Sequence, residues 1–138
     1  MKVVCKFNTL TSIKCSETKS RLKKYIKLPD DDELDIRIGE KYVVYGLLFW
    51  NNCPWFYLCS ENYDEYPKPY PSEFFDIIDD RISLYWKLSF YSQSNHEAKT
   101  SLVFEEWAKD PNYYERLIDG DINAVELFAK YRQIIDKE

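Results

Sequence analysis

Two neighbouring segments, residues 41–50 (KYVVYGLLFW) and 54–60 (PWFYLCS), constrain the fold more than any other part of the chain. Both are rich in β-branched and aromatic residues and only three residues separate them, so they predict a β-hairpin. Successive side chains of a strand point to opposite faces, and in residues 41–50 neither face is polar. Such a strand is covered on both sides, as in a small barrel or under a helix, and we expect Gly46 to mark a bend.

The other β-type patterns also lie in the first two thirds of the chain. Residues 2–7 (KVVCKF) predict an opening strand. The run FFDIIDDRISLYW predicts one strand, a corner at Asp79 and Asp80, and a further strand over 81–90. Residues 12–28 fit a helix and a strand equally well, and the pattern leaves this choice open.

The pattern changes to a helical period after a polar linker at residues 91–100. Ser101 is a candidate N-cap for a first helix, Pro111 and Gly120 bound a second, and Asp121 caps a third. The third helix has an apolar face formed by Ala124, Leu127, Phe128, Tyr131, Ile134 and Ile135.

Together these patterns predict one α+β domain over residues 1–138. Residues 1–91 are mainly β and form a curled antiparallel sheet or a small SH3-like barrel, and residues 101–137 form a helical tail packed against it. The length of 138 residues and an apolar fraction of 45% are sufficient for a packed core.

Composition argues against several classes of protein. No apolar stretch is long enough for a membrane span or a signal peptide, so we expect a cytoplasmic protein without membrane contact. The four cysteines lack a C-x-x-C spacing and the chain has one histidine, so we expect free thiols and no metal site. The chain has only three glycines and no phosphate-binding loop, so no cofactor is expected.

No known catalytic motif is present, and the sequence predicts a protein that is not an enzyme. The paired carboxylates at 79–80 and 105–106 do not point in one direction, because adjacent side chains diverge in both strands and helices. An enzyme that uses Asp79, Glu105 or His96 is the remaining catalytic alternative.

Charge is distributed unevenly along the chain. Residues 1–28 contain eight basic side chains and one acidic one, whereas residues 29–138 contain 11 basic and 23 acidic ones. The basic segment 14–27 could steer a partner or could be a solvated face, and the sequence does not decide between these roles. Acidic residues accompany most of the aromatic ones, so phosphates would be repelled and nucleic acid is not the expected partner. The same acidity suits a protein that covers a basic surface.

Loop tyrosines beside carboxylates form the predicted partner-binding surface, because exposed tyrosines are good anchors for protein binding. Its residues are Tyr63, Asp64, Glu65, Tyr66, Tyr70, Asp79 and Asp80. Pro67, Pro69 and Pro71 alternate with other residues and lack the P-x-x-P spacing, so they predict a stiff connector along a sheet edge that displays Tyr66 and Tyr70.

Residues 34–91, with the order IRIGEKYVVYGLLFW, PWFYLCSEN, YPKPYPSEFFDIIDD, resemble small SH3-like β-barrels of bacterial proteins. The whole chain is similar in size, acidity and aromatic content to the small immunity proteins of bacterial toxin systems, including contact-dependent growth inhibition. This resemblance implies a cytoplasmic protein that binds and neutralises a cognate toxin domain. The alternative is an SH3-like module that binds a peptide or regulatory partner in an aromatic groove near Trp50, Trp55 or Trp86.

Overall fold

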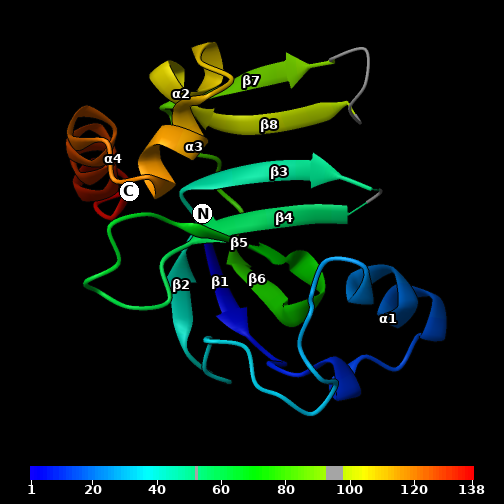
Figure 1. The fold of residues 1–138 in the computed structure, drawn as a ribbon. Coiled ribbons are helices and arrows are strands. Elements are labelled where there is room, and N and C mark those ends of the chain that lie inside the picture. Colours follow the sequence, from blue (N-terminus) through cyan, green and yellow to red (C-terminus); the bar gives the residue numbers. More distant parts are fainter. Residues whose placement is uncertain (52, 93–97) are drawn as a thin grey trace.

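A computed structural model describes residues 1–51, 53–92 and 98–138. In these residues the chain forms two antiparallel sheets and four α-helices (Figure 1). The strands are β1 (Lys2–Cys5), β2 (Lys41–Val43), β3 (Gly46–Trp50), β4 (Cys53–Leu58), β5 (Lys68–Pro71), β6 (Phe75–Asp79), β7 (Trp86–Tyr91) and β8 (Lys99–Phe104). The helices are α1 (Ser16–Lys23), α2 (Glu105–Lys109), α3 (Tyr113–Ile118) and α4 (Ile122–Ile135), with short 3-10 turns at Leu10–Ser12 and Ser72–Phe74.

The smaller sheet has the strand order β2-β1-β6, and the larger one has the order β5-β4-β3-β8-β7. The α+β class and the antiparallel pairing are therefore as predicted. The described strands do not close into one barrel, because they belong to two separate sheets.

Residues 41–50 form two strands and not one. β2 pairs with β1 in the smaller sheet, whereas β3 pairs with β4 and β8 in the larger sheet. The chain changes sheet just before Gly46, which is close to the predicted bend. A Cβ atom at Gly46 would lie 2.8 Å from Cγ1 of Val103 and 3.3 Å from the carbonyl oxygen of Leu102. An added side chain would therefore force Val103 to move, so the close approach of β8 favours glycine here.

The predicted hairpin of residues 41–60 is confirmed in part. The second half of its first strand, β3, pairs with β4 from Gly46–Tyr57 to Trp50–Cys53. The predicted corner at Asp79 and Asp80 is wrong. β6 pairs with β1, while the next strand begins only at Trp86 and pairs with β8 in the other sheet.

The predicted helix start at Ser101 is also wrong. Residues 99–104 form β8, which inserts between β3 and β7, and α2 begins at Glu105. The Thr-Ser-Leu-Val-Phe run has high β-propensity, and pairing on both sides outweighs the helical spacing of its apolar residues. The predicted polar linker at 91–100 covers the end of β7 and the start of β8, and its centre, residues 93–97, lies outside the described residues.

The last two helix boundaries are as predicted. Gly120 has a φ of +77°, a conformation that favours glycine, at the end of α3. The side chain of Asp121 accepts a hydrogen bond of 2.9 Å from the backbone N–H of Ala124 and caps α4. Residues 12–28, left open by the sequence, contain α1.

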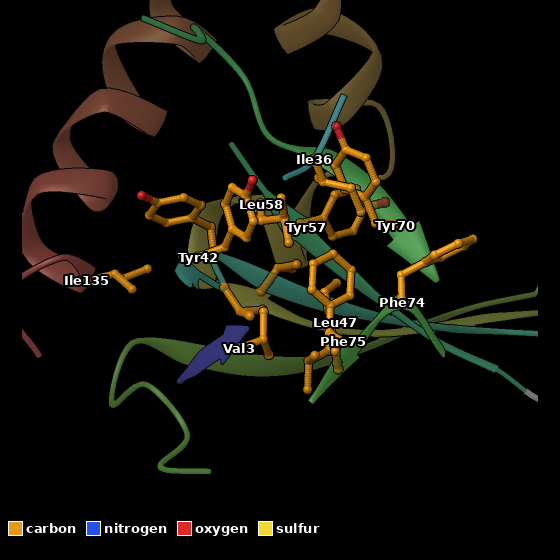
Figure 2. Packing of buried hydrophobic residues seen from close by; sticks show 14 of the residues in the cluster. Val3, Ile36, Tyr42, Leu47, Tyr57, Leu58, Tyr70, Phe74, Phe75 and Ile135 are labelled. Atoms are coloured by element: carbon orange, nitrogen blue, oxygen red, sulfur yellow. The ribbon is translucent and has the colours of Figure 1, made fainter. Parts of the chain in front are cut away.

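The core lies where the two sheets and the helices meet. Figure 2 shows side chains from the smaller sheet, such as Val3 and Phe75, in one cluster with Leu47 and Tyr57 from the larger sheet. Helix α4 joins this core through Phe128, whose ring lies 5.5 Å from that of Tyr45. Among the described residues, no helix has the length and apolar character needed to cross a bilayer.

Candidate protein-binding surfaces

Four of the predicted binding residues, Tyr63 to Tyr66, lie in the loop that connects β4 to β5. We call residues 61–66 the acidic loop. The side chain of Tyr63 is 81% exposed at this loop, and Glu65 is also exposed. Asp64 and Tyr66 are partly buried. The loop therefore presents the Tyr63 ring and the Glu65 side chain to solvent.

Hydrogen bonds hold the acidic loop in one conformation. Within the loop, the backbone N–H of Glu61 donates to a carboxylate oxygen of Asp64 at 2.9 Å. From helix α4, the guanidinium of Arg132 donates to the carbonyl oxygen of Asp64 at 2.6 Å and to that of Glu61 at 3.4 Å. Arg37 forms an ion pair with the carboxylate of Glu61. A loop anchored at these points loses little conformational entropy when it binds a partner.

Tyr70 does not contribute to an exposed rim as predicted. Its side chain is only 4% exposed, and its hydroxyl donates to Asp35 at 2.5 Å. The edge position itself is confirmed, because β5 is the terminal strand of the larger sheet and Pro69 and Pro71 lie opposite Tyr57 and Trp55. Strand β5 therefore places its prolines at the edge of the sheet and the Tyr70 ring in the core.

The carboxylate of Asp35 accepts hydrogen bonds from two residues of this edge strand, Lys68 and Tyr70. Burial raises the pKa of its carboxyl group, but hydrogen bonds from Lys68 and Tyr70 outweigh burial and hold the pKa below its usual value. The ammonium of Lys68 lies 2.5 Å from the Asp35 carboxylate. Burial and the hydrogen bond to Asp35 raise the pKa of the Tyr70 hydroxyl, which stays protonated as the donor.

Asp79 and Asp80, the other two predicted binding residues, lie at the end of β6 and beyond it. Arg81 donates to both carboxylate oxygens of Asp79, at 2.8 and 2.5 Å, and lowers the pKa of that carboxyl well below its usual range. Asp80 is exposed. In the part of the chain that the structure describes, no hydrogen bond or ion pair joins either residue to the acidic loop. The predicted binding residues thus come from two segments of the fold, the β4–β5 connection and the end of β6.

An aromatic groove is lined by residues of β3, β4 and β5, and the sequence predicts only part of this lining. Its volume is about 490 Å³, which is in the range of ligand sites. Trp50 and Trp55 line it as expected, whereas Trp86 is buried opposite Phe104 in another part of the sheet. The remaining lining residues are Lys24, Tyr25, Ile26, Leu34, Asp35, Leu48, Lys68, Pro69, Tyr70 and Pro71.

The basic segment 14–27 contributes Tyr25 to this groove. The Tyr25 ring lies 4.2 Å from the ring of Trp50 and 5.6 Å from that of Trp55, measured between centroids. Lys24 lines the groove, and the ammonium of Lys99 lies 5.7 Å from the Trp50 ring. The rim is thus basic although the chain as a whole carries a net charge of −5.

Part of the charge of the basic segment is neutralised by ion pairs within the fold. Lys19 and Lys23 lie 3.1 and 2.9 Å from the carboxylate of Asp30, and Arg21 pairs with Glu73. Three of the six basic side chains of segment 14–27 are therefore paired, and two carboxylates serve all three.

Of the catalytic candidates that the structure describes, Asp79 and Glu105 are each paired with a different basic side chain, Arg81 and Lys109. Glu105 pairs with Lys109, and Glu106 accepts a hydrogen bond of 2.7 Å from the hydroxyl of Tyr131. His96 lies outside the described residues. The four cysteines are free thiols, and the described residues contain no group of three or more metal-ligating side chains.

No family model matches this chain. No curated protein and no solved structure is significantly similar to it. Conclusions about its function must therefore be drawn from the surfaces themselves.

Proposed function

We propose that this chain is a cytoplasmic immunity protein that binds a cognate toxin domain through the acidic loop and thereby neutralises it. The observation that carries the proposal is the exposure of Tyr63 on a loop fixed by Arg132 and flanked by carboxylates. Fixed, exposed tyrosines are typical anchors of protein interfaces.

The chemistry of the loop fits a basic partner. Glu65 is exposed next to the Tyr63 ring, and Glu61 and Asp64 add negative charge to the same loop. A cluster of this sign attracts a lysine- or arginine-rich surface during the encounter, while the aromatic ring supplies the buried contact area. A toxin domain that acts on nucleic acid has a basic active site, so this loop is suited to covering it.

The first test is the substitution Tyr63→Ala. We expect it to weaken binding to the cognate toxin domain by at least about 30-fold, equivalent to about 2 kcal/mol, because an interface anchor is lost. The melting temperature should hardly change, because Tyr63 is exposed. Binding is measured by titration calorimetry, and protection by growth on co-expression of toxin and inhibitor.

A matched control is Tyr85→Ala, which removes a less exposed tyrosine outside the acidic loop. This variant should retain affinity and protection. Failure of the wild-type protein to co-purify with the toxin domain, together with no protection of growth, would exclude the immunity function. Tyr70→Ala is unsuitable as a binding test, because Tyr70 is buried and its loss would destabilise the fold.

The aromatic groove supports a second candidate function, that of a peptide-binding module. Aromatic and proline side chains accept extended peptides, and the rim lysines select a peptide with acidic residues. An alternating Glu-Pro peptide should then shift the indole NMR signals of Trp50 and Trp55, which line the groove, and leave those of Trp86 and Trp107, which do not line it, in place. A Lys-Pro peptide of equal length is the control, and equal shifts with both peptides would contradict this function.

A further inference from the structure

The larger sheet has an uncovered apolar face at its β7-β8-β3 end. The pairing register aligns Leu88, Leu102 and Leu47 across the three strands, and in the next row it aligns Phe90, Thr100 and Phe49. Directly paired residues of antiparallel strands lie on the same face. We call Phe49, Leu88, Phe90, Thr100 and Leu102 the apolar face.

The side chains of this face are open to solvent. Leu88 is 70% exposed, Phe90 62% and Phe49 42%. On the opposite side of the same sheet, the hydroxyls of Ser89 and Tyr91 donate to the carbonyl oxygen of Ala108 at 3.0 and 2.7 Å, so helix α2 covers that side. In Figure 1, β7 lies at the free edge of the sheet. The sheet is thus covered on one side at this end and bare on the other.

The apolar surface continues beyond the two rows. Phe49 also lines a hollow of about 470 Å³ between β3, β4 and β6, together with Pro54 and Ile77. Contiguous apolar surface of this kind on a folded domain marks a place where another layer packs. Addition of a strand along the edge of β7 would leave Phe49 and Leu102 exposed, since strand pairing covers an edge and not a face. A layer that packs face to face is needed.

We infer that this layer is a second copy of the same chain, related to the first by a two-fold axis. Neither row of the apolar face contains a charged side chain. Two copies that each carry a net charge of −5 can therefore bring these two rows together without placing like charges opposite each other within them, and Asp76, which lines the adjoining hollow, is paired with Lys6. A two-fold interface brings the same patch of both copies together, and an uncharged apolar patch is complementary to itself.

A basic partner is attracted to a different part of the molecule. The acidic loop follows the C-terminal end of β4, whereas Phe49 and Phe90 lie at the opposite ends of the paired strands. The apolar face has no carboxylate in either row to pair with lysine or arginine. The dimer interface and the proposed toxin-binding loop are therefore separate, and one can be absent without the other.

Sedimentation equilibrium tests this inference. The wild-type protein should have twice the chain mass of 16.7 kDa, and Leu88→Lys should raise the dimer dissociation constant at least about tenfold, because two ammonium groups would be buried against apolar surface. Ile122→Lys is the matched control, because Ile122 is 73% exposed on the first turn of α4 and its replacement should leave the dimer intact. Circular dichroism checks that both variants are folded.

Cross-linking provides a second measurement that does not depend on a loss of association. In a Cys15→Ser background, which removes the exposed thiol, Leu88→Cys should form a cross-linked dimer with a short thiol-specific linker, and Ile122→Cys should not. A monomeric wild-type protein, or a dimer that Leu88→Lys leaves unchanged, would overturn the inference. A monomer whose Leu88→Lys variant loses binding to the toxin domain would assign the apolar face to that partner instead.

Discussion

Replacing Trp107 by alanine is expected to lower the free energy of unfolding by about 3–5 kcal/mol. Trp107 is only 7% exposed and joins the helical tail to the larger sheet. Its ring lies 4.8 Å from the ring of Tyr57 in β4, and it stacks on Tyr114 of α3 at 5.4 Å. Phe104 and Tyr113 contribute further ring contacts at 5.6 and 5.4 Å. Alanine would lose all of these contacts and leave a cavity between sheet and helices.

Urea denaturation followed by circular dichroism measures this loss. Tyr63→Ala is the matched aromatic control, and we expect a change within about 0.5 kcal/mol because that ring is exposed. A loss below about 1 kcal/mol for Trp107→Ala would mean that the tail is held on the sheet by α4 and not by this aromatic cluster.

The features that the sequence predicts correctly depend on neighbouring residues. Gly120 and Asp121 end one helix and begin the next through their own backbone angle and side chain. The β3–β4 hairpin needs only a short connection between two segments of high β-propensity. Pro69 and Pro71 indicate an edge strand because neither can donate a backbone hydrogen bond.

The incorrect predictions concern which strands become neighbours. Gly46 indicates a bend within residues 41–50, but their β-pattern does not indicate that β2 and β3 join different sheets. The alternation of Ile82 and Leu84 predicts a strand, yet both side chains are exposed and the strand starts at Trp86. The insertion of β8 between β3 and β7 is a long-range choice that local propensity does not contain.

The same difference between local and long-range interactions explains which residues of the candidate sites could be predicted. Tyr63 could be predicted because its exposure follows from a polar loop. The hydroxyl of the buried Tyr70 donates a hydrogen bond to Asp35, which lies 35 residues earlier, and such a long-range partner is not visible in the local sequence. The aromatic groove was only partly predictable, because Tyr25 meets Trp50 and Trp55 only in the folded chain. The apolar face likewise exists only because β8 aligns Phe90 with Phe49 and Leu88 with Leu47.

Gly46 offers a direct test of how β3 and β8 approach each other. We expect Gly46→Ala to lower the free energy of unfolding by about 1–3 kcal/mol, because the added methyl group would lie 2.8 Å from Cγ1 of Val103. In a Val103→Ala background this methyl group has space, and only the carbonyl oxygen of Leu102 at 3.3 Å remains close. The cost of Gly46→Ala should then fall to nearly zero, since alanine also restricts the unfolded chain by about 0.4–1 kcal/mol relative to glycine.

A double-mutant cycle measured by urea denaturation isolates this contact. The two substitutions should couple favourably by at least about 1 kcal/mol, so that the double variant is more stable than the sum of the single effects indicates. The same cycle between Gly46→Ala and Val43→Ala is the control and should show no coupling, because Val43 is the last residue of β2 and is not among the atoms closest to the new methyl group. Additive effects at Gly46 and Val103 would mean that β8 does not lie close to Gly46, where the chain passes from the smaller sheet to the larger one.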